Sequence, residues 1–308
     1  MAKDTWSNKF FQQRQTKRDQ QGVDAFVHHR QMQSAAESER HCHPAMDLRR
    51  KPLRESRDSD KFPESLAITV FFDETGSMGK IPRVLQQNLN QLMGSLLRHG
   101  VKDPQVMIGA IGDAGMGEIA PVQVGEWETD LKIDDCLGQL FLEGKGGGNG
   151  HESYDLALYA MARHTSIDCW EKRQHKGCLV IIGDELPYAQ VDRRLVKDYI
   201  GDDLDDNIAL GRIVREVKER FEVLFILPTS IGGNEDSYLN EVQRRWADLF
   251  GSERCIVMHD PSKVSEIIAN WVGTIERAKR GDVANATTED NAEPQAGGRK
   301  RRSRVTPL

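Results

Sequence analysis

The sequence lacks the features that define several common classes of protein. Its 308 residues contain no apolar run near the roughly 18 residues that a membrane-spanning helix needs. The sequence at residues 1–6 shows no apolar core of the kind that a signal peptide has. The five cysteines are widely spaced and form no Cys-x-x-Cys pair, which argues against a disulfide framework and favours a reduced setting. These absences together predict a cytoplasmic protein.

Negative charge is scarce at both ends of the chain and abundant in its middle. Residues 63–276 carry a net charge of -14, whereas residues 1–62 and 277–308 each carry +4. Because nucleic acids are densely negative, an acidic body is a poor surface for binding them. Only the basic run 299–304, from Arg299 to Arg304, could touch nucleic acid weakly. A metal ion or a basic protein partner suits the body better.

Composition divides the chain into three parts. Residues 1–62 are rich in Gln, Arg, Lys and His and poor in large apolar residues, which predicts a basic polar N-terminal arm, partly helical or flexible. Residues 63–280 form the expected folded domain. Residues 281–308 cannot bury a core and end in a basic run, which predicts a disordered basic C-terminal tail.

Strand and helix patterns alternate through the central part. Short apolar, β-branched runs predict buried strands, and apolar residues at helical spacing predict the helices between them. The expected strands are 66–72, 105–111, 118–127 (as an edge), 177–182, 223–227 and 255–258. The expected helices are 82–97, 131–142, 153–164, one or two within 191–220, 238–250 and 262–280. This alternation predicts an α/β fold with a doubly wound, mostly parallel six-stranded sheet and helices on both faces.

Oxygen donors gather after three of the expected strands, at the edge of the sheet where such folds bind ligands. Asp73, Thr75 and Ser77 are spaced two residues apart, so one carboxylate and two hydroxyls can turn toward one point. Two further loops add an amide and two carboxylates: Asn149, Glu152 and Asp184. Asp73–Ser77 alone could be a helix N-cap, but the other loops favour a metal site. Mg²⁺ prefers such ligands, and Mn²⁺ accepts them.

At these residues the sequence resembles the von Willebrand factor A (vWA) family. Its metal-ion-dependent adhesion site (MIDAS) is written Asp-x-Ser-x-Ser, then a Thr in a later loop, then an Asp. Asp73, Thr75 and Ser77 match the first motif, and Asp184 matches the final Asp. The Asp-x-Thr-Gly-Ser-Met variant and the Gly-Gly-Gly-Asn loop look like a bacterial-type branch. The resemblance covers about residues 64–280 and implies a Rossmann-like vWA fold with bound Mg²⁺.

One ligand of the family pattern, the Thr, has no match here. Asn149 occupies the position of the Thr when the glycine-rich loop is used as the guide. Glu152 occupies it when residues are counted back from the helix that follows. Both assignments stay open from the sequence. Asp113, at the end of the 105–111 strand, and Ser153 are candidates for holding the ligands in place from behind.

The resemblance implies a protein that binds another protein through the metal ion. Hydroxyl ligands are neutral, so they do not fully balance the positive charge of the ion. In the family, an Asp or Glu of the partner supplies the missing negative charge. Bacterial members often work beside MoxR-type AAA+ ATPases, which makes an adaptor for such an ATPase the expected context. A metal-dependent phosphohydrolase is one alternative, and a structural subunit of a larger assembly is another. Because no residues form an obvious nucleophile and base, we expect no enzyme activity.

Overall fold

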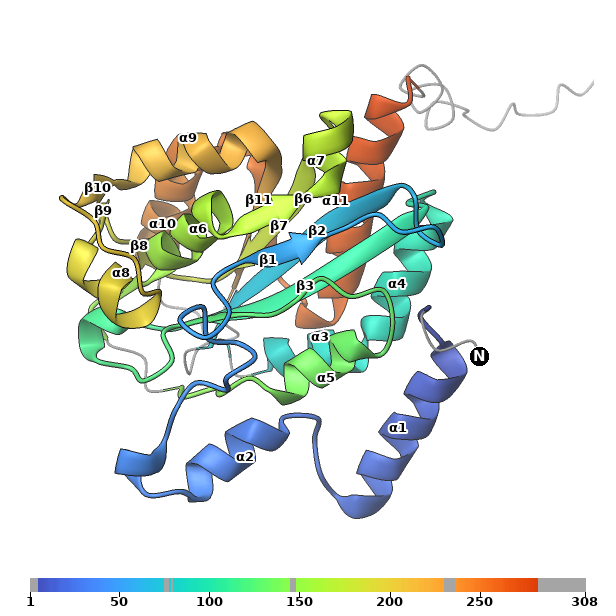
Figure 1. Ribbon diagram of the computed structural model, residues 1–308, viewed down its shortest axis with the longest axis horizontal. Coiled ribbons are helices and arrows are strands. Elements are labelled where there is room, and N and C mark those ends of the chain that lie inside the picture. Colours follow the sequence, from blue (N-terminus) through green and yellow to red (C-terminus); the bar gives the residue numbers. More distant parts are fainter. Residues whose placement is uncertain (1–4, 75–77, 79, 145–147, 230–235, 282–308) are drawn as a thin grey trace, which may run out of the picture.

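A six-stranded sheet forms the centre of the computed structural model, which describes residues 5–74, 78, 80–144, 148–229 and 236–281 (Figure 1). The strands are β2 (Ser65–Asp73), β3 (Asp103–Ile111), β4 (Val122–Val124), β7 (Gly177–Ile182), β11 (Phe221–Pro228) and β12 (Cys255–Met258). Every neighbouring pair is parallel except β3 and the edge strand β4. The expected mostly parallel sheet of six strands is therefore confirmed, including the edge strand.

The order of the strands places a switch point at the centre of the sheet. They follow one another as β12-β11-β7-β2-β3-β4. Numbered along the chain, this is the doubly wound order 3-2-1-4-5-6 read from the β4 edge. The chain leaves β2 toward β3 on one side and reaches β7 on the other. Ligands of doubly wound sheets bind beyond the carboxyl ends of the strands at this point, which here lies between β2 and β7.

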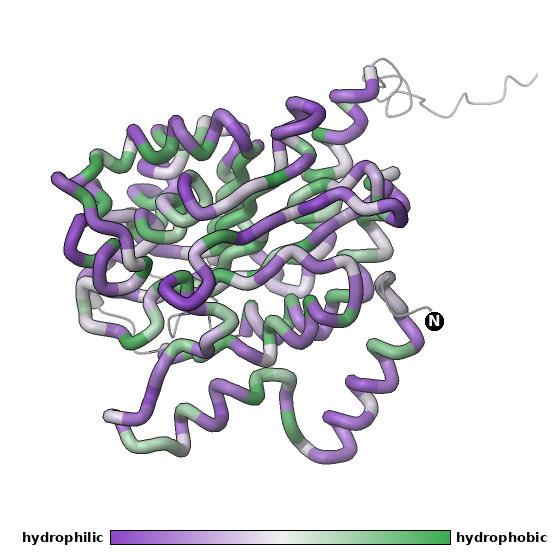
Figure 2. The backbone as a smooth tube through the Cα atoms, in the orientation of Figure 1, coloured by the Kyte–Doolittle hydropathy of each residue, from purple (hydrophilic) through white to green (hydrophobic). Residues whose placement is uncertain are grey.

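Helices cover both faces of the sheet because side chains alternate along each strand. Ile68, Val70 and Phe72 of β2 belong to one apolar core, whereas Ala67 and Phe71 belong to the other. The first core is covered by α3 (Ile81–Gln87), α4 (Leu89–Arg98), α5 (Lys132–Gly138) and α11 (Val264–Lys279). The second is covered by α6 (Tyr154–Arg163), α8 (Arg193–Tyr199), α9 (Leu210–Arg220) and α10 (Asp236–Phe250). Hydrophobic colour accordingly gathers on the central strands (Figure 2).

Several local elements differ from the expectation. The single helix expected over 82–97 is two helices, α3 and α4, which meet at Asn88. The helix expected over 131–142 ends at Gly138. One helix and three short strand pairs were not anticipated: α7 (Asp168–Arg173), β1 (Arg54–Ser56) with β6 (Thr165–Ile167), β5 (His151–Glu152) with β8 (Leu186–Pro187), and β9 (Gln190–Val191) with β10 (Ile208–Ala209). Strands of two or three residues are too short to give a periodic signal.

The N-terminal segment folds into two helices, α1 (Asn8–Gln21) and α2 (Val27–Ser34), which lie outside α3 and α5 (Figure 1). Phe11 and Phe26 are buried in the first core. Arg18 donates to the buried carboxylate of Asp134 at 2.7 Å, and Gln86 of α3 donates to the other oxygen of that carboxylate at 2.7 Å. Apolar anchors and a buried charge pair therefore hold this segment against the domain.

Arg54 joins the N-terminal segment to the edge of the sheet. Its side chain has 0% exposure, and its guanidinium donates to the carbonyl oxygens of Ala45, Lys51 and Val124 at 2.7–3.0 Å. The amide of Val124 donates to Met46 O at 3.0 Å, so the chain near residue 46 also covers the outer edge of β4. The packed body thus begins before residue 63.

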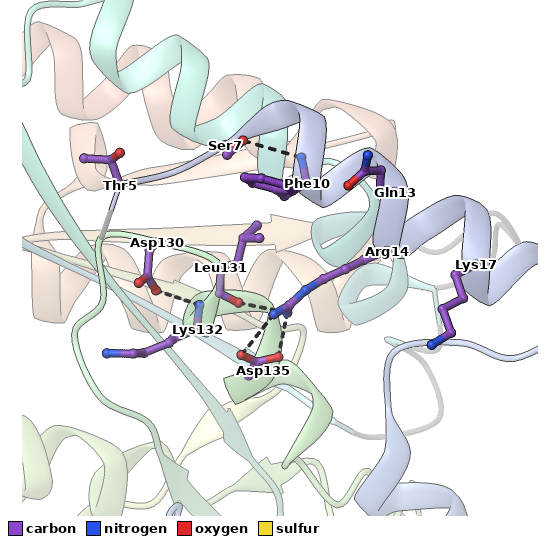
Figure 3. A pocket seen from close by; sticks show the side chains of 10 residues that line it. All are labelled: Thr5, Ser7, Phe10, Gln13, Arg14, Lys17, Asp130, Leu131, Lys132 and Asp135. Carbon is purple, nitrogen blue, oxygen red and sulfur yellow. Dashed lines mark hydrogen bonds and ion pairs between the residues drawn. The ribbon is translucent and has the colours of Figure 1, made fainter. Parts of the chain in front are cut away.

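A groove of about 580 Å³ lies between α1 and the beginning of α5 (Figure 3). The Arg14 side chain crosses it and donates to Asp135 at 2.6 Å, and the half-exposed Phe10 lies near Leu131 at its rim. None of the candidate metal ligands that the structure describes lines this groove. The described candidate ligands lie instead at the carboxyl edge of the sheet.

Candidate metal site

Asp73 is the last residue of β2 and is fully buried at the switch point. Tyr154, the first residue of α6, donates its hydroxyl to Asp73 Oδ2 at 2.9 Å. The other two residues of the motif, Thr75 and Ser77, lie outside the described residues. The structure therefore places the carboxylate of the motif where the sequence predicts it, at the end of the central strand.

Glu152 reaches the same edge because of the short pairing between β5 and β8. This pairing aligns His151 with Leu186, so the loop before α6 runs beside the loop after β7. Glu152 is fully buried, and neither of its carboxylate oxygens has a hydrogen-bond partner among the residues the structure describes. Burial, together with the nearby charges of Asp73 and Glu185, raises its pKa to about 11. Bare buried oxygens of this kind are costly unless a proton or a cation neutralises them.

Asp184 belongs to the same group of charges. It follows β7 and is half-buried. The pKa of Tyr154 is raised above its usual range first by burial, and then by the charges of Asp73, Asp184 and Glu152 in that order. The charges of three carboxylates from three separate segments therefore act on the Tyr154 hydroxyl, and Asp73 is the one that it contacts by a hydrogen bond.

Asn149 lies nearby but is engaged elsewhere. It is exposed, and its amide nitrogen donates to Asp113 Oδ2 at 2.8 Å and to the Tyr188 hydroxyl at 3.0 Å. Its side-chain oxygen accepts the His151 amide at 2.9 Å. Asp113 in turn accepts the Tyr188 hydroxyl at 2.9 Å. Asn149 and Asp113 thus form a polar cluster with Tyr188 that orders the loop.

Ser153 fastens the start of α6 to the neighbouring strand end. Its hydroxyl accepts the Ala114 amide at 2.9 Å, and its own amide donates to Gly112 O at 3.0 Å. Ser153 is fully buried. These bonds fix the backbone that carries Glu152.

A second set of buried carboxylates, which the sequence analysis did not single out, lies beside Asp73. Gln123 of β4 donates to Glu74 Oε2 at 2.9 Å, while Glu74 Oε1 has no hydrogen-bond partner in the described part of the chain. A Cβ on Gly112 would lie 1.9 Å from Glu118 Oε2 and 2.9 Å from Glu74 Oε1, so a side chain there would have to displace these carboxylates. Burial, followed by the charges of Glu118 and Glu143, raises the pKa of Glu74. Adjacency to Asp73 was the one signal available for Glu74.

These residues fit a hard divalent cation in their chemistry. Across the described ranges, no three His, Cys, Asp or Glu side chains stand together as a ready set of metal ligands. Two of the ligands expected from the motif are hydroxyls outside those ranges. The buried oxygens of Glu152 have no partner among the described residues, however, and Mg²⁺ would stabilise the charged form of this carboxylate, which burial and Asp73 disfavour. Asp73, Glu152 and Asp184 would hold such an ion with Thr75 and Ser77.

Comparison with known proteins finds distant similarity to solved structures. No family model and no curated protein matches the sequence. The open conformation of the pilus adhesin SpaC from Lactobacillus rhamnosus GG is 11% identical with a TM-score of 0.49, over 73% of this chain and 31% of that one. The vWF domain of the type V pili tip protein Mfa5 from Porphyromonas gingivalis is 9% identical with a TM-score of 0.44, over 70% of this chain and 96% of that one.

Proximal thread matrix protein 1 from the mussel byssus is 12% identical with a TM-score of 0.45, over 69% of this chain and 48% of that one. The chain therefore spans about a third of the SpaC chain and half of the byssus protein. Among the described residues, no helix has both the length and the apolar character needed to cross a membrane.

Proposed function

We propose that this protein is a vWA-like interaction module that binds another protein through a divalent cation, most simply Mg²⁺. The ion is held at the carboxyl edge of β2 and β7 by Asp73, Glu152 and Asp184, with Thr75 and Ser77 from the motif. The partner supplies an acidic side chain as a further ligand. The observation that carries the proposal is Glu152, which is buried beside Asp73 with both of its carboxylate oxygens unpartnered among the described residues.

The fold supports this location independently of the motif. The doubly wound strand order puts its switch point between β2 and β7, where Asp73 ends β2 and Asp184 follows β7. Glu152, in place of the Thr of the family pattern, brings a third carboxylate to the ion. We therefore expect tighter metal binding and a weaker pull on the acidic side chain of a partner than a Thr would give.

The biological context that we propose, an adaptor for a MoxR-type AAA+ ATPase, rests on the resemblance of the motif alone. The experiment uses the purified full chain as bait for candidate partners, with Mg²⁺ or with a chelator. We expect wild type and the exposed control variant Glu219→Gln to retain a partner only with Mg²⁺, and Asp73→Ala to retain none. Retention that survives the chelator would argue against adhesion through the ion. Mg²⁺-dependent turnover of p-nitrophenyl phosphate, lost in Asp73→Asn, would instead favour the phosphohydrolase.

A further inference from the structure

We infer that Tyr154 is the residue that positions Asp73 for the ion. This inference rests on the proposed metal site and adds a residue that the vWA-like motif does not contain. It stands on three observations: the immobile ring of Tyr154, the close approach of Gly183 to its hydroxyl, and the hydrogen bond to Asp73.

The Tyr154 ring packs edge-on against a stacked pair of aromatic rings, Trp246 and Phe225. It is fully buried and meets Trp246 edge-on, with centroids 5.1 Å apart and planes at 90°. Phe225 of β11 meets it at 6.3 Å and 79°. The position of Trp246 is stabilised by a hydrogen bond, since its indole nitrogen donates to Glu185 O at 3.1 Å. A tyrosine has only two side-chain torsions, so these contacts fix its hydroxyl in space.

Gly183 leaves room for that hydroxyl at the end of β7. A Cβ at this position would lie 2.0 Å from Tyr154 Oη, which is far closer than atoms can approach. Gly183 is not one of the glycines with positive φ, so its backbone conformation does not require glycine. Its amide donates to Ile226 O at 3.1 Å, which fixes the backbone there. The missing side chain therefore serves to admit the Tyr154 hydroxyl between β2 and β7.

The chemistry of the bond suits a metal ligand. The hydroxyl donates to one carboxylate oxygen of Asp73 and so fixes the plane of the carboxylate. A phenol is a neutral donor, so it brings no positive charge that would compete with the cation, as a lysine or arginine would. Groups that hydrogen-bond a metal ligand from behind orient it, and their loss typically weakens metal affinity by about 10- to 100-fold.

The same helix supplies a matched control. Tyr159, also buried in α6, donates its hydroxyl to Asp202 at 2.6 Å, and neither residue is among the proposed ligands. Tyr154→Phe and Tyr159→Phe each remove one hydroxyl and one tyrosine–aspartate hydrogen bond. We expect Tyr154→Phe to raise the dissociation constant for Mg²⁺ by about tenfold or more in calorimetric titration. Tyr159→Phe should bind Mg²⁺ like wild type, although both variants lose some thermal stability without metal.

The spectrum of bound Mn²⁺ supplies a second readout, which a merely structural role would not move. We expect the electron paramagnetic resonance spectrum to change in Tyr154→Phe and to stay unchanged in Tyr159→Phe. Should Tyr154→Phe not fold, Gly183→Ala tests the same contact, because its Cβ displaces the hydroxyl. Equal Mg²⁺ affinity in wild type and Tyr154→Phe would overturn the inference and leave the metal site standing. Absence of Mg²⁺ binding in the wild type would overturn both.

Discussion

Replacing Glu152 with glutamine is expected to weaken Mg²⁺ binding by about 100-fold or more. The glutamine keeps the size of the side chain and removes its negative charge. Glu152 is fully buried beside Asp73, so its charge acts on the ion with little screening by water. Calorimetric titration of the metal-free protein with Mg²⁺ measures the change directly.

Asn149→Ala is the matched control for this prediction, because the sequence left Asn149 and Glu152 as rival candidates for one ligand position. The Asn149 amide nitrogen binds Asp113 and Tyr188, so its loss should loosen the loop and change Mg²⁺ affinity by no more than about threefold. The opposite ranking, with Asn149→Ala the more damaging change, would assign the position to Asn149 and contradict the role of Glu152.

Replacing Arg54 with methionine is expected to lower the free energy of unfolding by about 3–5 kcal/mol. The guanidinium is fully buried, donates to three carbonyl oxygens and lies 3.2 Å from the Glu126 carboxylate. Methionine fills much of the volume, but it leaves those carbonyls without their donor and Glu126 without this partner. Urea unfolding followed by circular dichroism measures the loss.

Arg50→Met supplies the comparison for Arg54→Met. Arg50 is exposed and four residues away, and no ion pair to another described residue involves it. Its replacement should change stability by no more than about 0.5 kcal/mol. Equal stabilities of the two variants would mean that the segment around Arg54 is a loosely held arm. The predicted difference would make this segment part of the folding unit.

The sheet could be predicted from the sequence because its strands carry strong local signals. β2 and β7 are continuous apolar runs, and the helices between strands show helical spacing of apolar residues. The break at Asn88, whose carbonyl oxygen accepts the Ser265 hydroxyl at 3.4 Å, and the pairing of β5 with β8 both involve segments distant in the sequence. Buried Arg54 gave no signal, because arginine in a polar stretch is usually a surface residue.

The candidate site could likewise be predicted only in part from the sequence. Asp73 and Asp184 could be placed at the ligand-binding edge because each lies within two residues of the end of a predicted strand. Asn149 and Glu152 could not be separated by sequence, since both belong to one short loop. Their difference in burial comes from β5, which turns Glu152 inward. Nothing in the sequence singled out Tyr154, and only the folded chain brings its hydroxyl to Asp73.

The central claim is that a divalent cation binds between the ends of β2 and β7, and diffraction from crystals grown with Mn²⁺ tests it most directly. An anomalous difference map locates manganese without reference to any side chain. The account predicts a peak within about 2.0–2.3 Å of oxygen atoms of Asp73 and Glu152, with Asp184 bound directly or through water. Well-ordered crystals grown in millimolar Mn²⁺ that show these carboxylates and no peak between them would contradict it.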